Sequence, residues 1–239
     1  MTKLIVALDK DNLAEAMTLV DTAGAEVEWY KIGSQLFCKE GPKAVQELKK
    51  RGKKIFLDLK FHDIPNTVAN AVANAVVMGV DMVNVHATGG TEMMQRSIEA
   101  ANKMSKDKNH IPLVIAVTVL TSMNHESLNE VLNTEGSGIS PAKQVIHLAK
   151  LAKKSGLHGV VCSAHEIQII KKECGSDFAL IVPGIRPAGS AVGDQKRVMT
   201  PLEAAKAGAD FIVVGRPVLL ADNPSDAAKK INQELQSIN

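Results

Sequence analysis

Short apolar runs rich in β-branched residues recur along this chain and constrain its fold more than any other feature. Most of the runs are almost continuously hydrophobic, as strands of a parallel sheet are when both faces are covered. Glycine and other turn residues separate the runs from their neighbours. The sequence predicts strands at Leu4–Leu8, Val27–Ile32, Lys54–Lys60, Met82–His86, Leu113–Leu120, Gly159–Cys162, Ala179–Val182 and Phe211–Val214.

The segments between the predicted strands have helical periodicity. Val68, Val72, Ala75 and Val76 share one helical face, for example, and similar spacings recur between the other strands. Strand–helix repeats of this kind over 239 residues predict an α/β fold, a (β/α)8 TIM barrel. An open doubly wound sheet is the alternative, but no GxGxxG motif follows the first strand. Because no linker is rich in Pro, Ser or Gly, we expect a single domain over residues 1–239.

The composition narrows the classes of partner. A net charge of +2 and an aromatic content of 3% argue against binding to nucleic acid or to an acidic membrane surface. No apolar run approaches the roughly 18 residues that cross a bilayer. The first run ends in Asp9 and is too short for the core of a signal peptide. Three cysteines without a CxxC motif argue against a disulfide framework or a zinc site and favour the cytoplasm.

The segment Asp58-Leu59-Lys60-Phe61-His62-Asp63-Ile64-Pro65 places two carboxylates around one ammonium group directly after a predicted strand. Side chains two residues apart in a strand point to the same face, so we expect Asp58 and Lys60 to project together. Buried charges are costly unless they pair. A structural ion pair explains this spacing as well as a catalytic pair does, and the position in the fold decides between them.

In a (β/α)8 barrel, chemistry concentrates at the C-terminal ends of the strands. Polar residues gather at several of these predicted ends. They are Asp9 after the first strand, Lys31 on the second, Asp58, Lys60 and Asp63 at the third, and Thr121 and Ser122 after the fifth. Taken singly, the charges also have structural explanations as a helix cap, a surface lysine or a charge at a helix N-terminus. Their convergence on one barrel mouth favours a functional site.

Alternating lysines and aspartates have a chemical use. A lysine between two carboxylates is held in its charged form, so Lys60 is able to donate a proton or to face a developing carbanion. An ionised Asp58 repels a substrate carboxylate placed beside it. The pattern favours loss of a carboxylate as carbon dioxide, followed by protonation of the same carbon.

The last two predicted strands lead into a different kind of site. The seventh runs into Pro183-Gly184-Ile185-Arg186 and a polar loop that contains Gln195, and the eighth runs into Gly215-Arg216. Loops at these places in barrels commonly bind phosphate. Glycine allows close approach of the backbone, and arginine adds a forked cation. A turn glycine and a surface arginine are the alternative explanation.

The segment Asp58–Thr67 resembles the signature of the bacterial orotidine 5′-monophosphate decarboxylase family. Further matches follow in the same order along the chain, at Ile5–Asp9, Lys31–Gly33, Leu120–Ser122, Pro183–Arg186 and Val213–Arg216. The resemblance covers nearly the whole chain. It implies a decarboxylase, without cofactor or metal, that converts orotidine 5′-monophosphate (OMP) to UMP in the last step of de novo pyrimidine nucleotide synthesis.

The resemblance also implies roles for the matching residues. Lys60 would protonate C6 of the pyrimidine beside Asp58, with Lys31 and Asp9 at the ribose. Asp63 and Thr67 would reach the site of a neighbouring subunit, so that a homodimer shares its active sites. The other substrate contacts would be Thr121 and Ser122 at the ribose and base, Pro183, and Arg186, Gln195, Gly215 and Arg216 at the phosphate.

Three other assignments remain open. A magnesium-dependent sugar-phosphate enzyme of the same superfamily would need an acidic residue where this chain has Lys31. A Schiff-base aldolase would need Lys60 as a nucleophile, which flanking carboxylates disfavour. A non-catalytic phosphate-binding barrel would need a broken charge array, and this one is complete. His62 and His86 lack the spacing of a metal pair, so we expect them to form hydrogen bonds near the site.

Overall fold

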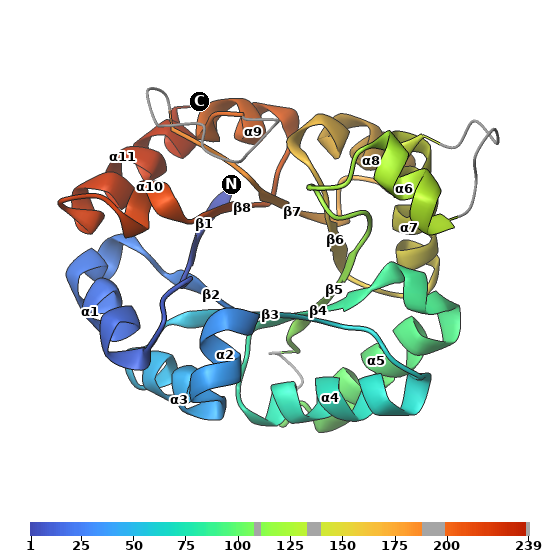
Figure 1. Cartoon of the computed structure of the whole chain (residues 1–239), viewed down its shortest axis with the longest axis horizontal. Coiled ribbons are helices and arrows are strands. Elements are labelled where there is room, and N and C mark those ends of the chain that lie inside the picture. The colour runs from blue at the N-terminus through green and yellow to red at the C-terminus, as the bar shows by residue number, and fades with distance from the viewer. Residues whose placement is uncertain (108–110, 133–139, 188–198, 238–239) are drawn as a thin grey trace.

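The computed structural model describes residues 1–107, 111–132, 140–187 and 199–237. Its parallel strands close into a barrel in the order β1 to β8, with β8 paired back to β1 (Figure 1). The strands are β1 (Lys3–Ala7), β2 (Trp29–Gly33), β3 (Lys54–Phe61), β4 (Met82–His86), β5 (Leu113–Val117), β6 (Gly159–Val161), β7 (Ala179–Pro183) and β8 (Phe211–Val214). The predicted (β/α)8 barrel is confirmed.

Helices surround the barrel on its outside (Figure 1). They are α1 (Leu13–Ala23), α2 (Ser34–Glu40), α3 (Pro42–Lys50), α4 (Pro65–Val77), α5 (Gly90–Met104), α6 (His125–Leu132), α7 (Pro141–Lys154), α8 (Ile167–Cys174), α9 (Pro201–Ala207), α10 (Arg216–Leu219) and α11 (Pro224–Gln236), with 3-10 helices η1 (Gly24–Glu26), η2 (Ala87–Gly89) and η3 (Ala164–Glu166). Within the described ranges, no helix is both long and apolar enough to cross a membrane.

The strands bury both of their faces, which explains their near-continuous hydrophobicity. Alternate side chains point to opposite sides of a strand. One set packs inside the barrel, and the other set packs against the helices in a larger cluster. The inner cluster contains Ile5, Ala7, Trp29, Phe56, Met82, Ile115, Ile181, Phe211 and Val213. Continuing the same alternation toward the strand ends brings Lys31 and Asp58 to the mouth of the barrel, where Lys60 also lies.

Most predicted strand boundaries agree with the structure within two residues, but the prediction for β5 is wrong at its C-terminal end. The strand stops at Val117 and does not continue to Leu120. Thr118 donates its hydroxyl to the carbonyl oxygen of Val161 at 3.0 Å, and the N–H of Met123 donates to the carbonyl oxygen of Leu120 at 2.9 Å. A turn therefore replaces the last part of the expected strand.

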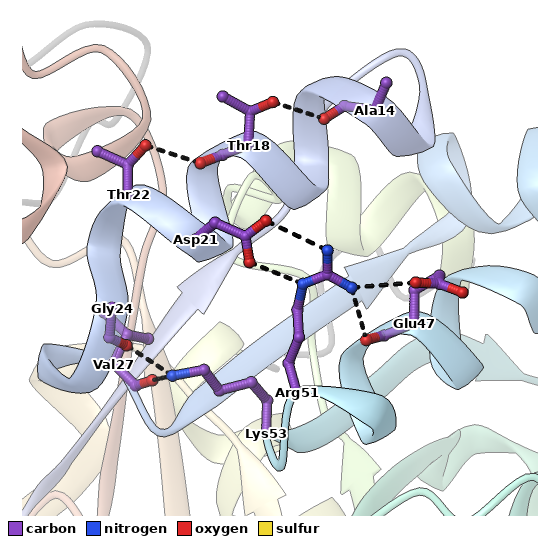
Figure 2. A network of polar contacts seen from close by, with 9 residues as sticks. All are labelled: Ala14, Thr18, Asp21, Thr22, Gly24, Val27, Glu47, Arg51 and Lys53. Carbon is purple, nitrogen blue, oxygen red and sulfur yellow. Dashed lines mark hydrogen bonds and ion pairs between the residues drawn. The ribbon is translucent and has the colours of Figure 1, made fainter.

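A polar network ties elements together near the N-terminal ends of β2 and β3 (Figure 2). Arg51 donates from Nε to Asp21 Oδ1 at 2.7 Å and from Nη1 to Glu47 Oε2 at 3.0 Å, which joins α1 to α3. Lys53 Nζ donates to the carbonyl oxygens of Gly24 at 2.6 Å and Val27 at 2.9 Å. Burial lowers the pKa of Lys53. This end of a barrel supports stability, and the opposite end carries the chemistry.

Candidate active site

The C-terminal ends of the strands surround two adjoining cavities. The first, of about 180 Å³, is lined by Lys31, Asp58 and Lys60 and by apolar side chains of β3 and β5 to β8. The second, of about 510 Å³, lies toward β1, β7 and β8. Because Lys31, Pro183 and Val213 line both cavities, the two form one continuous mouth.

Four charges form an unbroken chain across this mouth. Lys31 Nζ lies 3.1 Å from Asp9 Oδ1 and 3.4 Å from Asp58 Oδ2. Lys60 Nζ lies 2.7 Å from Asp58 Oδ1. The order is therefore Asp9, Lys31, Asp58, Lys60, with positive and negative groups in alternation. The side chain of Lys31 is only 13% exposed, which excludes the surface-lysine explanation.

Asp58 is the most enclosed carboxylate of this chain of charges, with 8% of its surface exposed. Burial alone would raise its pKa. The ammonium groups of Lys31 and Lys60, with hydrogen bonds from Lys60 and Asn84, outweigh burial and bring the pKa of Asp58 below the ordinary value. Asp58 is thus a fixed negative charge beside a cavity with apolar walls.

The backbone of β3 is irregular where it carries these charges. Leu57 pairs with Val83 of β4, and Phe61 pairs with Val85, so the three residues from Asp58 to Lys60 lie opposite Asn84 alone. Lys60 has φ of 52°, the only positive φ of a non-glycine residue in the described ranges. Bulges of this kind redirect side chains and recur beside active sites.

Gly33, at the end of β2, leaves the space that the Lys31 ammonium group occupies. A Cβ atom at Gly33 would lie 2.9 Å from Lys31 Nζ and 3.7 Å from Asp9 Oδ1. The backbone of Gly33, with φ of −94° and ψ of 179°, is open to any residue. Close packing against Lys31 is therefore the reason for glycine here, and sequence reasoning did not identify it.

Apolar side chains form most of the remaining wall of the first cavity. Val117, Val161, Ile181 and Val213 project into it from β5, β6, β7 and β8. They offer apolar surface next to the charged pair of Asp58 and Lys60 and lower the local dielectric. Sequence analysis did not single them out, although their alternation with helix-facing residues was a usable signal.

The second cavity contains the predicted phosphate residues that the structure describes. Arg186 is 6% exposed, its N–H donates to the carbonyl oxygen of Met199 at 3.0 Å, and it lines the cavity together with Pro183. Gly215 and Arg216 line it from the start of α10. Two arginines thus line one cavity at the ends of β7 and β8. Gln195 lies outside the described residues.

Other predicted residues lie at or outside the rim. Thr121 lines the first cavity, whereas Ser122 is exposed and lines neither. Asp63 and Thr67 are exposed at the start of α4. Oδ1 of Asp63 accepts a hydrogen bond from the N–H of Ile64 at 2.6 Å. In the part of the chain that the structure describes, no ion pair joins Asp63 to the four-charge chain.

The structure excludes one alternative role, that of Asp9 as a helix cap. Asp9 does not cap the following helix, because Asn12 does so by accepting from the N–H of Glu15 at 2.9 Å. The rings of His62 and His86 lie 5.3 Å apart between centroids, and burial, followed by the effects of His62 and Lys60, lowers the pKa of His86. The described residues contain no group of three or more His, Cys, Asp or Glu side chains placed to hold a metal ion.

Comparisons with known proteins point to one family. Residues 2–231 match the model of the orotidine 5′-phosphate decarboxylase / HUMPS family. The chain is 51% identical over 236 residues to the orotidine 5′-phosphate decarboxylase of Aliivibrio fischeri strain MJ11, covering 99% of this chain and 98% of that protein. It is 48% identical over 237 residues to that of Actinobacillus succinogenes, covering 99% of each. The crystal structure of the Lactobacillus acidophilus orotidine 5′-phosphate decarboxylase matches with a TM-score of 0.87 and 36% identity, over 99% of this chain and 100% of that chain.

Proposed function

Because this chain belongs to the orotidine 5′-phosphate decarboxylase / HUMPS family, we propose that its four-charge chain is the catalytic centre at which OMP loses carbon dioxide. The activity is that of a carboxy-lyase in pyrimidine nucleotide synthesis. The observation that carries the proposal is the 2.7 Å contact between Lys60 and Asp58 at the edge of a cavity with apolar walls.

The proposed chemistry uses both members of this pair. The carboxylate on C6 of the pyrimidine lies beside the ionised Asp58 and is repelled by it. The bond from C6 to the carboxylate carbon breaks, carbon dioxide leaves, and the electron pair stays on C6. Lys60 stabilises this carbanion with its positive charge and transfers a proton from Nζ to C6, which gives UMP. The lysine recovers its proton from water. No cofactor enters these steps.

The rest of the mouth would bind the remaining parts of OMP. Lys31 and Asp9 would contact the ribose, and Thr121 and Ser122 would contact the ribose and base. Arg186, Gly215 and Arg216, with Pro183 beside them and Gln195 from the loop, would hold the phosphate, as the second cavity supports. Binding energy at the phosphate, remote from C6, is available to align the base against Lys60.

We also propose a homodimer in which Asp63 and Thr67 complete the site of the neighbouring subunit. Lys60 contacts only one carboxylate, Asp58, in the described part of the single chain. Asp63 follows Lys60 by three residues in the sequence and is exposed, as is its neighbour Ile64, whose side chain is 66% exposed. We further propose that residues 1–239 act as one catalytic domain. We propose a cytoplasmic location because the three cysteines are all free, as is usual in a reducing compartment.

The absorbance of the orotate ring provides the direct test. The purified protein, in EDTA and without added cofactor, is expected to lower that absorbance and to form UMP and carbon dioxide in equal amounts. Lys60→Ala is expected to reduce kcat by about 10³-fold or more, while UMP affinity stays within about tenfold. Lys54→Ala, at the other end of β3, is the matched control and should remain active. A Lys60→Ala protein with nearly unchanged turnover would refute the proposed role.

Subunit mixing tests the shared site. Asp63→Ala and Lys60→Ala are each expected to be inactive, because each removes one half of every site. After exchange of subunits, mixed dimers contain one site with both native residues and should recover part of the activity. If exchange is verified by mass and activity does not return, the shared-site proposal is wrong.

A further inference from the structure

Asn84 occupies the gap that the irregular part of β3 opens in the sheet. It lies between Val83 and Val85, whose partners on β3 are Leu57 and Phe61. Regular ladder pairing is therefore lost over the residues that carry the catalytic charges. Asn84 is fully buried, at 0% exposure, in a strand that is otherwise almost entirely apolar. A polar side chain in such a place needs partners on each of its polar atoms.

Both ends of the Asn84 amide are used at the catalytic pair. Its Oδ1 accepts from the backbone N–H of Lys60 at 2.8 Å, and its Nδ2 donates to Oδ1 of Asp58 at 2.6 Å. We infer that Asn84 is a positioning residue for the decarboxylation, because it fixes the left-handed backbone of Lys60 and the carboxylate of Asp58 in one rigid unit. This inference rests on the proposed roles of Lys60 and Asp58.

The chemistry of the two partners explains why an amide is required. An ionised carboxylate only accepts hydrogen bonds, and a backbone N–H only donates them. Asn84 must therefore present a donor to one partner and an acceptor to the other, which also fixes the orientation of its amide. Left-handed backbone is costly for a residue with a side chain. The hydrogen bond to Lys60 N–H is one of the contacts that hold this conformation.

The effect on Asp58 is equally specific. Oδ1 of Asp58 accepts from Lys60 Nζ at 2.7 Å and from Asn84 Nδ2, while Oδ2 faces Lys31 Nζ at 3.4 Å. Donors from β2, β3 and β4 thus surround one carboxylate. Without the amide donor of Asn84, the carboxylate of Asp58 is free to rotate together with the ammonium group of Lys60. Displacements of about 1 Å in an active site are enough to cost about 100-fold in rate.

Two substitutions of Asn84 test the inference. Asn84→Leu keeps a similar size but removes both hydrogen bonds. Asn84→Asp keeps the acceptor and loses the donor when ionised, whereas its protonated form again has one donor and one acceptor. A carboxyl group placed against Asp58 shares a proton with it at raised pKa. As the pH falls, the protonated carboxyl group of Asn84→Asp should therefore restore the donor and the acceptor that the native amide supplies.

Ser97→Ala is the matched control. Ser97 is also fully buried and polar, and its Oγ donates to the carbonyl oxygen of Met93 at 2.7 Å within α5, away from the charges. The other titratable and charged groups near Asn84 and Asp58 are Lys31, Lys60, His62 and His86, with Asp9 paired to Lys31. They are unchanged in each variant, so the ratio of variant to wild-type activity at each pH isolates the new carboxyl group.

For Asn84→Leu we expect kcat about 100-fold below wild type, with UMP affinity within about threefold and a circular-dichroism spectrum like that of Ser97→Ala. For Asn84→Asp we expect the ratio of its kcat to that of wild type to rise as the pH falls from about 8 to about 5.5. A merely structural role would not produce this rise. If Asn84→Leu fails to fold, the pH dependence of Asn84→Asp decides alone.

Two results would overturn the role of Asn84. One is a folded Asn84→Leu protein with kcat within about threefold of wild type, and the other is an Asn84→Asp ratio that does not change with pH. Lys60→Ala, measured in parallel, separates this failure from failure of the proposed function. If Lys60→Ala is inactive while both Asn84 variants are fully active, only the positioning role is refuted. An active Lys60→Ala protein refutes the proposed function itself.

Discussion

The ammonium nitrogen of Lys60 lies 2.7 Å from Oδ1 of Asp58, although the two residues are separated in β3 by a single residue and by a left-handed turn of the backbone. Asp58 is buried and Lys60 is about one third exposed, with 37% of its side chain accessible. The pair therefore places a fixed negative charge inside the protein and a positive charge at the edge of the cavity. This asymmetry suits a reaction that repels a carboxylate and then delivers a proton.

The depressed pKa of Asp58 predicts how the enzyme responds to acid. A group whose pKa is lowered by folding adds stability that is complete above its unfolded pKa, about 3.9 for aspartate. That stability is lost as the pH falls through the lower pKa of the folded protein. We expect no loss of kcat/KM attributable to Asp58 until the pH is below about 3.9.

NMR of protein labelled with ¹³C at aspartate carboxyl groups tests this directly, with Asp58→Asn identifying the signal. The Asp58 signal should titrate below the free aspartate value. A midpoint above that value would contradict the charge arrangement described for Lys31 and Lys60.

Gly33→Ala is expected to separate activity from stability. The added methyl group would lie 2.9 Å from Lys31 Nζ, so the ammonium group must move away from Asp9 or Asp58. We expect kcat/KM to fall by about tenfold or more. The backbone at Gly33 accepts alanine without strain, and a less flexible unfolded chain adds on the order of 0.4–1 kcal/mol of stability. Thermal unfolding and steady-state kinetics on the same sample would show both effects, and a loss of stability with full activity would contradict the packing argument.

Arg216→Ala is expected to weaken binding of the substrate phosphate. Arg216 lines the second cavity with Arg186 and Gly215. We expect KM for OMP to rise by about 30- to 300-fold, which corresponds to about 2–3.5 kcal/mol of lost binding free energy. Orotidine, which has no phosphate, supplies the control, because its slow turnover should be the same in both proteins. Equal losses with OMP and orotidine would argue that Arg216 acts elsewhere.

Arg51→Ala is expected to affect stability alone. The guanidinium group joins α1 to α3 through Asp21 and Glu47 (Figure 2). This network lies by the N-terminal ends of the strands, whereas the cavities lie at the C-terminal ends. We expect Tm to fall by about 2–4 °C, with kcat and KM unchanged. Lys50→Ala provides the comparison, because Lys50 contacts the same Glu47 from a side chain that is 70% exposed. If the Tm of Arg51→Ala is as high as that of Lys50→Ala, the hydrogen bonds of Arg51 to Asp21 and Glu47 add no stability.

The barrel and the meeting of its charges could be predicted from the sequence because both follow from simple periodicities. Continuous apolar runs indicate parallel strands, and the ends of parallel strands in a barrel meet at one mouth. Asp9, Lys31, Asp58 and Lys60 lie together for that reason. The rule that side chains two apart share a face predicted the pairing of Asp58 with Lys60, although the real backbone between them is not a regular strand.

The remaining features depend on contacts that a one-dimensional pattern does not contain. Asn84 is one polar residue in an apolar strand, and its importance follows only from the bulge in the neighbouring strand. Gly33 looks like any residue before a helix until the position of Lys31 Nζ is known. The roles of Asp63 and Thr67 depend on a second subunit, so they stay predictions.

Trp29 lies on β2, two residues before Lys31, and packs edge to face against Phe211 with 5.2 Å between ring centroids. It is the only tryptophan of the chain, and among the described residues its buried indole N–H has no hydrogen-bond partner. Indole fluorescence shifts to longer wavelength when water reaches the ring. The protein thus contains a built-in optical probe inside the barrel, at the N-terminal end of β2, so that emission reports opening of the barrel interior without any label.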